Sequence, residues 1–206
     1  DQAGRTRLVT PTVGVLALQG AFAAHAGVFE ALGVDTVEVR TADQLLSVDA
    51  IVLPGGESTT MSMLLDRSGI LQPLRAQLDV GLPALGTCAG LILLADHIVG
   101  GRPDQHALGC LDLRVRRNAY GTQLDSFEAD IDVAGLDAPF HAVFIRAPIV
   151  ERVGPDVEVL ALVGDDPVLC RREQVTVATF HPELSGDDRI HRQWLAASGL
   201  GVHSNP

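Results

Sequence analysis

The sequence predicts an α/β fold with a mainly parallel central sheet, flanked by helices and extended by additional antiparallel strands. Apolar runs such as the one over 50–53 do not alternate with polar residues as a half-exposed strand does. Such continuous runs are typical of strands that are covered on both faces. In the first half of the chain these runs alternate with helical patterns at the pitch of βαβ units. The 206 residues, 47% of them hydrophobic, are enough to build one domain with its own core.

Each expected element follows from local periodicity and from its start and stop signals. In the first half, strands are expected at 12–18, 34–40, 50–53 and 83–87, and helices at 21–32, 58–66, 72–80 and 88–95. In the second half, strand-like segments separated by short turns lie at 111–115, 127–133, 142–145, 157–163 and 175–180. We expect these to pair more antiparallel and to return to the main sheet near Val175. A helix over 189–197 closes a single domain over 12–198, with flexible termini at 1–11 and 199–206.

Charge and cysteine content exclude several classes of function. Fifteen basic residues stand against 26 acidic ones, and this net charge of −11 argues against nucleic acid as a partner, because phosphate binding requires a basic face. Every basic residue is arginine, which excludes a P-loop lysine and a Schiff-base lysine. We find no run long enough to span a membrane and no secretory signal. Three scattered cysteines without metal-binding spacing suit a reducing cytoplasm, where we expect the protein.

The segment Gly86-Thr87-Cys88-Ala89-Gly90 places a cysteine between two glycines at the junction of an expected strand and an expected helix. This is the setting of a nucleophile elbow, in which a sharp turn lifts the side chain clear of the sheet and only small neighbours fit. The helix start favours the thiolate of Cys88, and the amide of Ala89 points to where an oxyanion forms. The alternative is a buried structural cysteine beside a glycine-rich turn, which the paired glycines disfavour.

A thiolate nucleophile in acyl transfer requires a base, and His181 at the end of the strand over 175–180 is the candidate. Glu183 can accept a hydrogen bond from the other ring nitrogen and so fix the tautomer of His181. The remaining histidines have no such companion and are expected at the surface or at helix ends: His25, His97, His106, His141, His191 and His203.

The segment Pro54-Gly55-Gly56-Glu57-Ser58 follows the expected strand over 50–53. Its two glycines allow a backbone amide to approach a reacting carbonyl closely, which makes this turn the candidate second oxyanion donor beside Ala89. The alternative is a plain turn in which Ser58 or Thr59 caps a helix. Arginine side chains suit a carboxylate ligand, but the residues alone do not choose among Arg114, Arg116, Arg117 and Arg146.

Together these segments resemble the class I (triad) glutamine amidotransferases, and among them the glutaminase subunits of pyridoxal 5'-phosphate synthase. The resemblance runs from about residue 13 to residue 195. Its general motifs are G-T-C-A-G at 86–90 and H-P-E at 181–183, and its more specific ones are P-G-G-E-S-T-T-M at 54–61, R-N-A-Y-G at 117–121 and F-I-R-A-P at 144–148. It implies a three-layer, flavodoxin-like fold.

The resemblance also implies a reaction and a partner. Cys88 would attack the side-chain amide of L-glutamine, His181 would relay the proton to ammonia, and Glu183 would orient His181. Oxyanion donors would come from Gly56 and Ala89. The implied glutamine-contacting residues are Gly56, Glu57, Ser58, Arg117, Ile145 and Arg146, with Gln19 near the site and the partner interface. The reaction would need no cofactor or metal. The chain would pass the ammonia to a (β/α)8-barrel synthase subunit in a large hetero-oligomer.

Two alternatives stay open. The chain could supply ammonia to another amidotransferase, such as imidazole glycerol phosphate synthase, although the F-I-R-A-P and R-N-A-Y-G segments speak against this. It could also be a non-catalytic docking subunit with the same fold. Such a subunit would have no need to keep Cys88, His181 and Glu183 together, so their presence speaks against this alternative.

Overall fold

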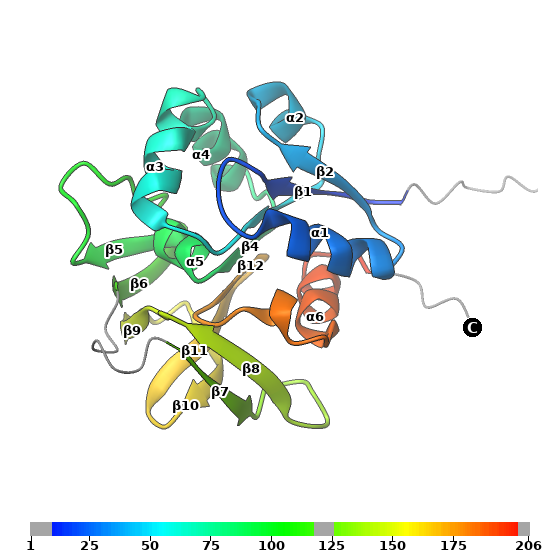
Figure 1. The fold of residues 1–206 in the computed structure, drawn as a ribbon, viewed down its shortest axis with the longest axis vertical. Helices are drawn as coiled ribbons and strands as arrows, with labels where there is room; N and C mark the ends of the chain where they lie inside the picture. The colour runs from blue at the N-terminus through cyan, green and yellow to red at the C-terminus, as the bar shows by residue number, and fades with distance from the viewer. Residues whose placement is uncertain (1–9, 118–125, 202–206) are drawn as a thin grey trace, which may run out of the picture.

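The computed structural model describes residues 10–117 and 126–201, whose strands form one large sheet and two small ones (Figure 1). The large sheet has the strand order β10-β11-β12-β4-β3-β1-β2. Its members are β1 (Thr12–Leu16), β2 (Asp35–Val39), β3 (Ala50–Leu53), β4 (Ala84–Thr87), β10 (Glu158–Val163), β11 (Asp166–Arg172) and β12 (Val175–Ala178). From β2 to β12 all neighbours pair parallel, which confirms the predicted sheet and gives the flavodoxin-like strand order.

Helices cover both faces of the large sheet and make three layers, as predicted. The helices are α1 (Phe22–Ala31), α2 (Ala42–Leu46), α3 (Ser58–Arg67), α4 (Leu71–Asp79), α5 (Ala89–Leu94) and α6 (Arg189–Ala197). Strand side chains point alternately to the two faces, so Val13 and Val15 pack with Phe29 of α1 and Trp194 of α6. Leu16 instead joins the core on the other face, beneath α2, α3, α4 and α5.

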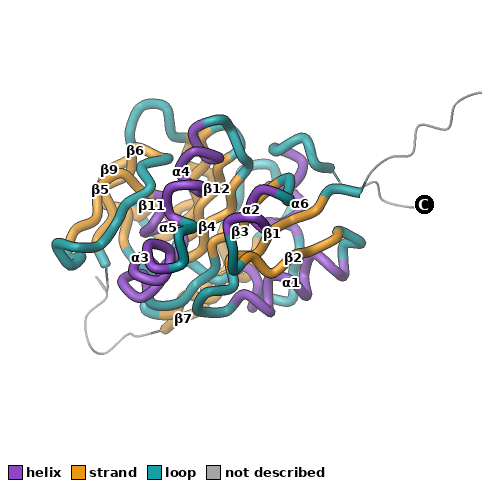
Figure 2. Tube along the Cα trace, turned by 90° about the horizontal axis from the view of Figure 1, so that it is seen from above, coloured by secondary structure: helices purple, strands orange, loops and turns teal. Residues whose placement is uncertain are grey.

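The second half of the chain forms the small sheets and the antiparallel edge of the large one. A three-stranded sheet contains β5 (Ala95–Val99), β6 (Leu111–Arg116) and β9 (Ile149–Val153), and a hairpin contains β7 (Ser126–Ile131) and β8 (Phe140–Ile145). The three-stranded sheet lies at the end of the molecule away from the start of β1 and the end of α6 (Figures 1 and 2). β12 then returns to pair parallel with β4, as the sequence predicts.

The strand order decides where a site can form. The carboxyl ends of β1, β3, β4 and β12 meet at one edge of the sheet, so the loops that follow these strands lie together. These loops carry Gln19, Gly55, Cys88 and His181.

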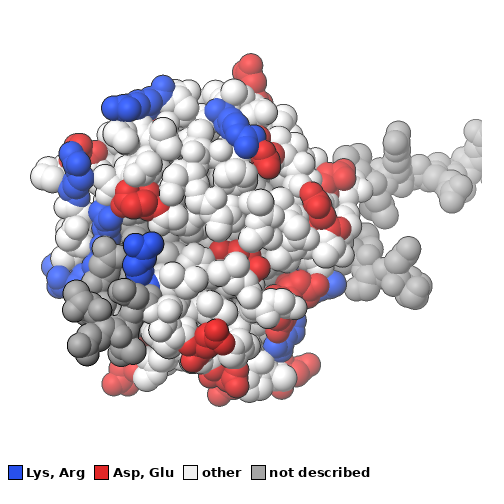
Figure 3. Space-filling view, in the orientation of Figure 1, with Lys and Arg blue, Asp and Glu red and all other residues white. Residues whose placement is uncertain are grey.

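The surface adds little to this picture. One face shows acidic and arginine side chains interspersed among uncharged ones (Figure 3). Within the described residues, no helix is long and apolar enough to cross a membrane. The same part of the chain contains no cluster of His, Cys, Asp and Glu arranged to hold a metal ion.

Candidate active site

Cys88 sits on a strained turn between β4 and α5. Its φ of 51° and ψ of −104° place a residue with a side chain in a backbone region that costs about 1–3 kcal/mol. The flanking glycines make the turn possible: a Cβ on Gly90 would lie 1.9 Å from the carbonyl oxygen of Leu53, and a Cβ on Gly86 would lie 2.8 Å from the carbonyl oxygen of Gly90. The local sequence thus holds the thiol in an elbow at the edge of the sheet.

The thiol, an imidazole and a carboxylate form one array. His181 lines the same cavity as Cys88, whose thiol raises the pKa of the His181 imidazole, and Nδ1 of His181 lies 2.7 Å from Oε1 of Glu183. The backbone N–H of His181 donates to the carbonyl oxygen of Val143 in β8 at 2.8 Å, which fixes the segment where β12 ends. Glu183 belongs to the short 3-10 helix Pro182–Leu184 and is buried behind His181.

The environment of His181 favours its charged form. Burial lowers the pKa of His181, but its interactions with Cys88 and Glu183 outweigh this effect and raise the pKa to about 10. Burial raises the pKa of Glu183, but the hydrogen bond from His181 and the neighbouring His25 more than offset this and lower it. An imidazolium held by a carboxylate beside the sulfur has a proton that it can give to a leaving group.

This raised pKa makes stability depend on pH. Folded His181 keeps a proton that the unfolded chain loses above pH about 6.5, so the stabilisation is complete below that pH. In Cys88→Ala, where no thiol proton is lost in exchange, we expect the free energy of unfolding to fall as the pH rises above about 6.5, by at most about 1.4 kcal/mol per pH unit from this group. Urea unfolding at a series of pH values measures the slope. His181→Gln added to Cys88→Ala is the control, and an equal slope in that double variant would contradict the assignment.

A cavity of about 350 Å³ opens beside the thiol. Every site residue predicted from the sequence lines this cavity except Glu183, which lies behind His181. These lining residues are Gln19, Gly56, Glu57, Ser58, Cys88, Ala89, Arg117, Ile145, Arg146 and His181. The sulfur of Cys88 lies 3.9 Å from the carbonyl oxygen of Ile145, which places the end of β8 beside the thiol at this cavity.

Glu57 has a structural task that the sequence did not reveal. We expected Ser58 or Thr59 to cap α3, but Glu57 is the N-cap, and its carboxylate accepts from the backbone N–H groups of Thr59 at 3.1 Å and Thr60 at 2.7 Å. The same carboxylate pairs with Arg117 at 2.7 Å. Burial raises the pKa of Glu57, but the bonds from Thr60 and Thr59 and the charge of Arg117 prevail and lower it to about 2.

Arg117 is held in place at the cavity wall. Its guanidinium donates to Oε1 of Glu57 at 2.7 Å, to Oγ1 of Thr59 at 2.6 Å and to Oε1 of Gln105 at 3.0 Å. Gln105 also donates to Oγ of Ser58 at 3.1 Å, so this loop residue, which the sequence analysis missed, ties Arg117 to the start of α3. The predicted segment after Arg117, from Asn118 to Gly121, lies outside the described residues.

A model of the SNO glutamine amidotransferase family matches residues 15–198. The chain belongs to this family. A pyridoxal 5'-phosphate synthase subunit PdxT from Mycolicibacterium vanbaalenii is 55% identical over 191 residues, which cover 91% of this chain and 97% of the relative. A protein of the same name from Frankia alni is 55% identical over 195 residues, with 93% and 98% covered. The predicted family resemblance is thereby confirmed.

Solved structures agree with the fold of this glutamine amidotransferase. A crystal structure described as a glutamine amidotransferase is 49% identical, with a TM-score of 0.86, and covers 91% of this chain and 98% of its own. A structure of PurLQS from Thermotoga maritima has a TM-score of 0.62 at 17% identity, covering 94% of this chain and 98% of its own. That second likeness shows the shared fold alone.

Two histidines of this glutamine amidotransferase lie where the sequence did not predict them. His25 and His191 were expected at the surface or at helix ends, and that prediction is wrong, because both are fully buried. A histidine in a helix of small residues gives no local sign of burial, and His25 is covered by residues distant in sequence, His191 of α6, Thr87 and Glu183. His97 and His141 are exposed and His106 is half-buried, whereas His203 lies outside the described residues.

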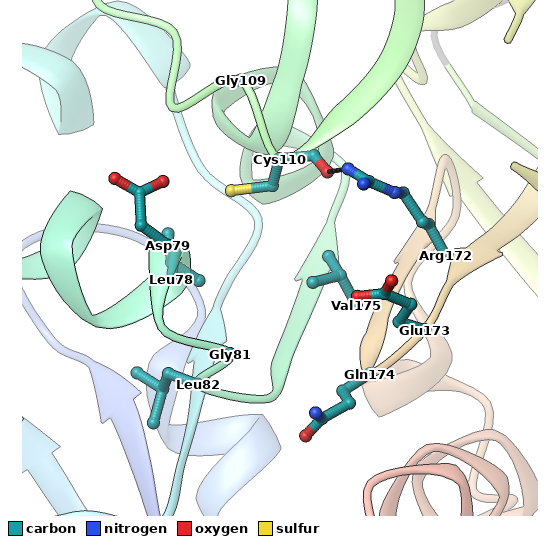
Figure 4. Close-up of a pocket in the computed structure, with 10 residues that line it drawn as sticks. All are labelled: Leu78, Asp79, Gly81, Leu82, Gly109, Cys110, Arg172, Glu173, Gln174 and Val175. Carbon is teal, nitrogen blue, oxygen red and sulfur yellow. Dashed lines mark hydrogen bonds between the residues drawn. The ribbon is translucent and has the colours of Figure 1, made fainter. Parts of the chain in front are cut away.

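A second cavity of about 280 Å³ lies at the other end of β4 and β12 (Figure 4). Cys110 lines it, and Arg172 donates a hydrogen bond to the Cys110 carbonyl oxygen at 3.2 Å. Burial raises the pKa of the Cys110 thiol to about 11 and that of Cys170 to about 12. Neither thiol has a histidine that could activate it among its described hydrogen-bond partners, which leaves Cys88 as the candidate nucleophile.

Proposed function

We propose that this chain is the glutaminase subunit of a pyridoxal 5'-phosphate synthase and hydrolyses L-glutamine to L-glutamate and ammonia. The observation that carries the proposal is the strained Cys88 thiol, which shares a cavity with Arg117 and with the His181 imidazole that Glu183 holds. Relatives named as pyridoxal 5'-phosphate synthase subunits, more than half identical over nine-tenths of the chain, support the choice of synthase.

The first half of the reaction forms a thioester. The Cys88 thiolate attacks the side-chain carbonyl carbon of glutamine, and the carbonyl electrons move to oxygen. Backbone N–H groups of Ala89 and Gly56 are the proposed donors to this oxyanion, because both residues line the cavity beside the sulfur. When the carbon–nitrogen bond breaks, the His181 imidazolium gives its proton to the departing nitrogen, which leaves as ammonia.

The second half releases glutamate. Neutral His181 takes a proton from a water molecule that attacks the γ-glutamyl thioester, and collapse of the second tetrahedral intermediate expels the Cys88 thiolate. His181 is again protonated and the resting pair is restored. The ammonia then passes to the synthase subunit, for which the sequence resemblance implies a (β/α)8 barrel. The cytoplasmic location stays a prediction.

Arg117 is the proposed partner of the glutamine α-carboxylate. We expect Arg117→Met to raise KM for glutamine about tenfold or more while kcat changes little, because a hydrogen bond to a charged group contributes about 1.5–3 kcal/mol. Steady-state kinetics with a coupled assay for glutamate measures both constants. Arg102→Met is the matched control, since Arg102 is exposed and pairs with Asp104 outside this cavity. A rise in KM of the same size in both variants would argue against a specific contact.

The decisive test compares ammonia release with and without a candidate synthase subunit. We expect glutamine-dependent ammonia release that increases when the synthase is added. Light scattering should show a particle larger than either protein alone when the two are mixed with glutamine. Cys88→Ala supplies the baseline. If the wild-type chain with its partner releases no more ammonia than Cys88→Ala, the glutaminase assignment fails. If ammonia is released but the synthase neither binds nor increases the rate, the pathway assignment fails instead.

A further inference from the structure

A pair of buried histidines lies directly behind the carboxylate of the active site. His25 on α1 and His191 on α6 are both fully buried, although 166 residues separate them in the chain. Nδ1 of His25 lies 3.0 Å from Nε2 of His191. Nε2 of His25 lies 3.1 Å from Oγ1 of Thr87 and 3.4 Å from Oε2 of Glu183. In the described part of the chain, that oxygen makes no hydrogen bond of normal geometry.

The unpaired atoms decide which ring nitrogens carry hydrogens. Nδ1 of His191 is buried and has no hydrogen-bond partner in the described chain, and a buried N–H without an acceptor is rarely tolerated. The hydrogen of His191 is therefore on Nε2 and is donated to Nδ1 of His25. The hydrogen of His25 is then on its own Nε2, where it faces Thr87 and Glu183. The opposite tautomer of His25 would direct a lone pair at a buried carboxylate.

Both imidazoles are neutral in this arrangement. Burial lowers the pKa of His25, and the attraction of Glu183 only partly offsets that effect. Burial, with the neighbouring His25, lowers the pKa of His191 well below its usual value. A neutral His25 can donate its N–H without cancelling the charge of Glu183. The carboxylate therefore keeps its full attraction for the imidazolium of His181, with which a cation at His25 would compete.

We propose that His25 is a positioning residue for the glutaminase reaction, an inference that rests on the proposed function. Its Nε2–H donates to Oγ1 of Thr87 and attracts Oε2 of Glu183 electrostatically at 3.4 Å. Oε1 of Glu183 therefore stays directed at Nδ1 of His181, and His191 keeps His25 in the required tautomer. His25 does not line the cavity beside Cys88, so it acts through Glu183. The titratable groups that face this array are Cys88, His181, Glu183 and His191.

Two variants separate positioning from simple packing. In His25→Gln the amide nitrogen reaches the place of Nε2, whereas in His25→Asn it reaches only the place of Nδ1. We expect His25→Asn to lower kcat for glutamine about tenfold or more with KM within about twofold of wild type. His25→Gln should stay within about threefold of wild type in both constants. Equal kcat in wild type and His25→Asn, or equal losses in the two variants, overturns the proposal.

A second measurement needs neither glutamine nor the synthase. NMR of the full chain with ¹⁵N-labelled histidine reports the tautomer of each ring and the titration of His181. We expect His25 and His191 to be neutral with hydrogen on Nε2, and the pKa of His181 to fall in His25→Asn but not in His25→Gln. A wild-type His25 that is charged at neutral pH, or protonated on Nδ1, overturns the proposal even if both variants fail to fold. Wild type without glutaminase activity would contradict the proposed function instead, while these spectra still test the position of the hydrogen.

Discussion

Replacing Cys88 by alanine is expected to lower kcat/KM for glutamine by roughly 10⁴-fold or more, because no thioester can form without the sulfur. The fold should persist, since alanine is smaller than cysteine and fits the same site. A glutamine analogue that carries an electrophilic diazoketone should label wild type at Cys88, as peptide mass spectrometry would show. Ammonia release and labelling therefore report the same residue by independent routes.

The control for Cys88 comes from the chain's other thiols. Cys110→Ala should keep full activity, because Cys110 lies in the cavity at the opposite end of β4 and its thiol has a raised pKa. Cys88→Gly should be as inactive as Cys88→Ala but more stable to urea than Cys88→Ala, since glycine adopts the φ of 51° without strain. Labelling that maps to Cys110 or Cys170 would contradict the proposed nucleophile.

Replacing Gly90 by alanine is expected to lower the free energy of unfolding by about 3 kcal/mol. The new Cβ would lie 1.9 Å from the carbonyl oxygen of Leu53, a backbone atom that cannot move without shifting β3 or α5. Because α5 begins directly after Cys88, the same shift should displace the nucleophile and lower kcat. Urea unfolding followed by circular dichroism measures the stability, and the ammonia assay measures the second effect.

Gly27→Ala is the matched control for Gly90→Ala. Gly27 is exposed in α1, and a Cβ there would have nothing within 4 Å. Alanine should therefore stabilise the protein by about 0.5–1 kcal/mol through its better helix propensity. A Gly90→Ala variant that is as stable as Gly27→Ala would show that β3 and α5 do not approach each other so closely.

The sequence predicted the parts of the fold that local pattern determines. Buried runs predicted β1, β3 and β4, the paired glycines predicted the turn at Cys88, and α6 begins and ends at the predicted residues. The short α2 was missed although Thr41 and Gln44 form a capping box, because five residues are too few to show a helical periodicity. β5, β9 and β11 were also missed, since pairing with distant strands makes them strands.

Some features of the site could be predicted from local sequence pattern, and others could not. Gly56, Cys88 and His181 each follow an expected strand, and the carboxyl ends of parallel strands converge at one edge of a sheet, so the sequence predicts that these residues lie together. Glu57 as a helix cap could not be foreseen, because glutamate is not among the favoured capping residues and its role depends on Arg117. The burial of His25 depends on His191, 166 residues further along the chain, and no local pattern encodes such a contact.

The placement of β12 bears on how the enzyme matures in the cell. β12 comes late in the chain yet inserts between β4 and β11, and the base His181 lies just beyond its last residue, Ala178. Because translation proceeds from the amino terminus, β4 emerges from the ribosome long before the strand that covers its open edge. A nascent or truncated polypeptide that stops before β12 has the sulfur but no proton carrier, so hydrolytic competence arrives only after β12 and His181 have been synthesised.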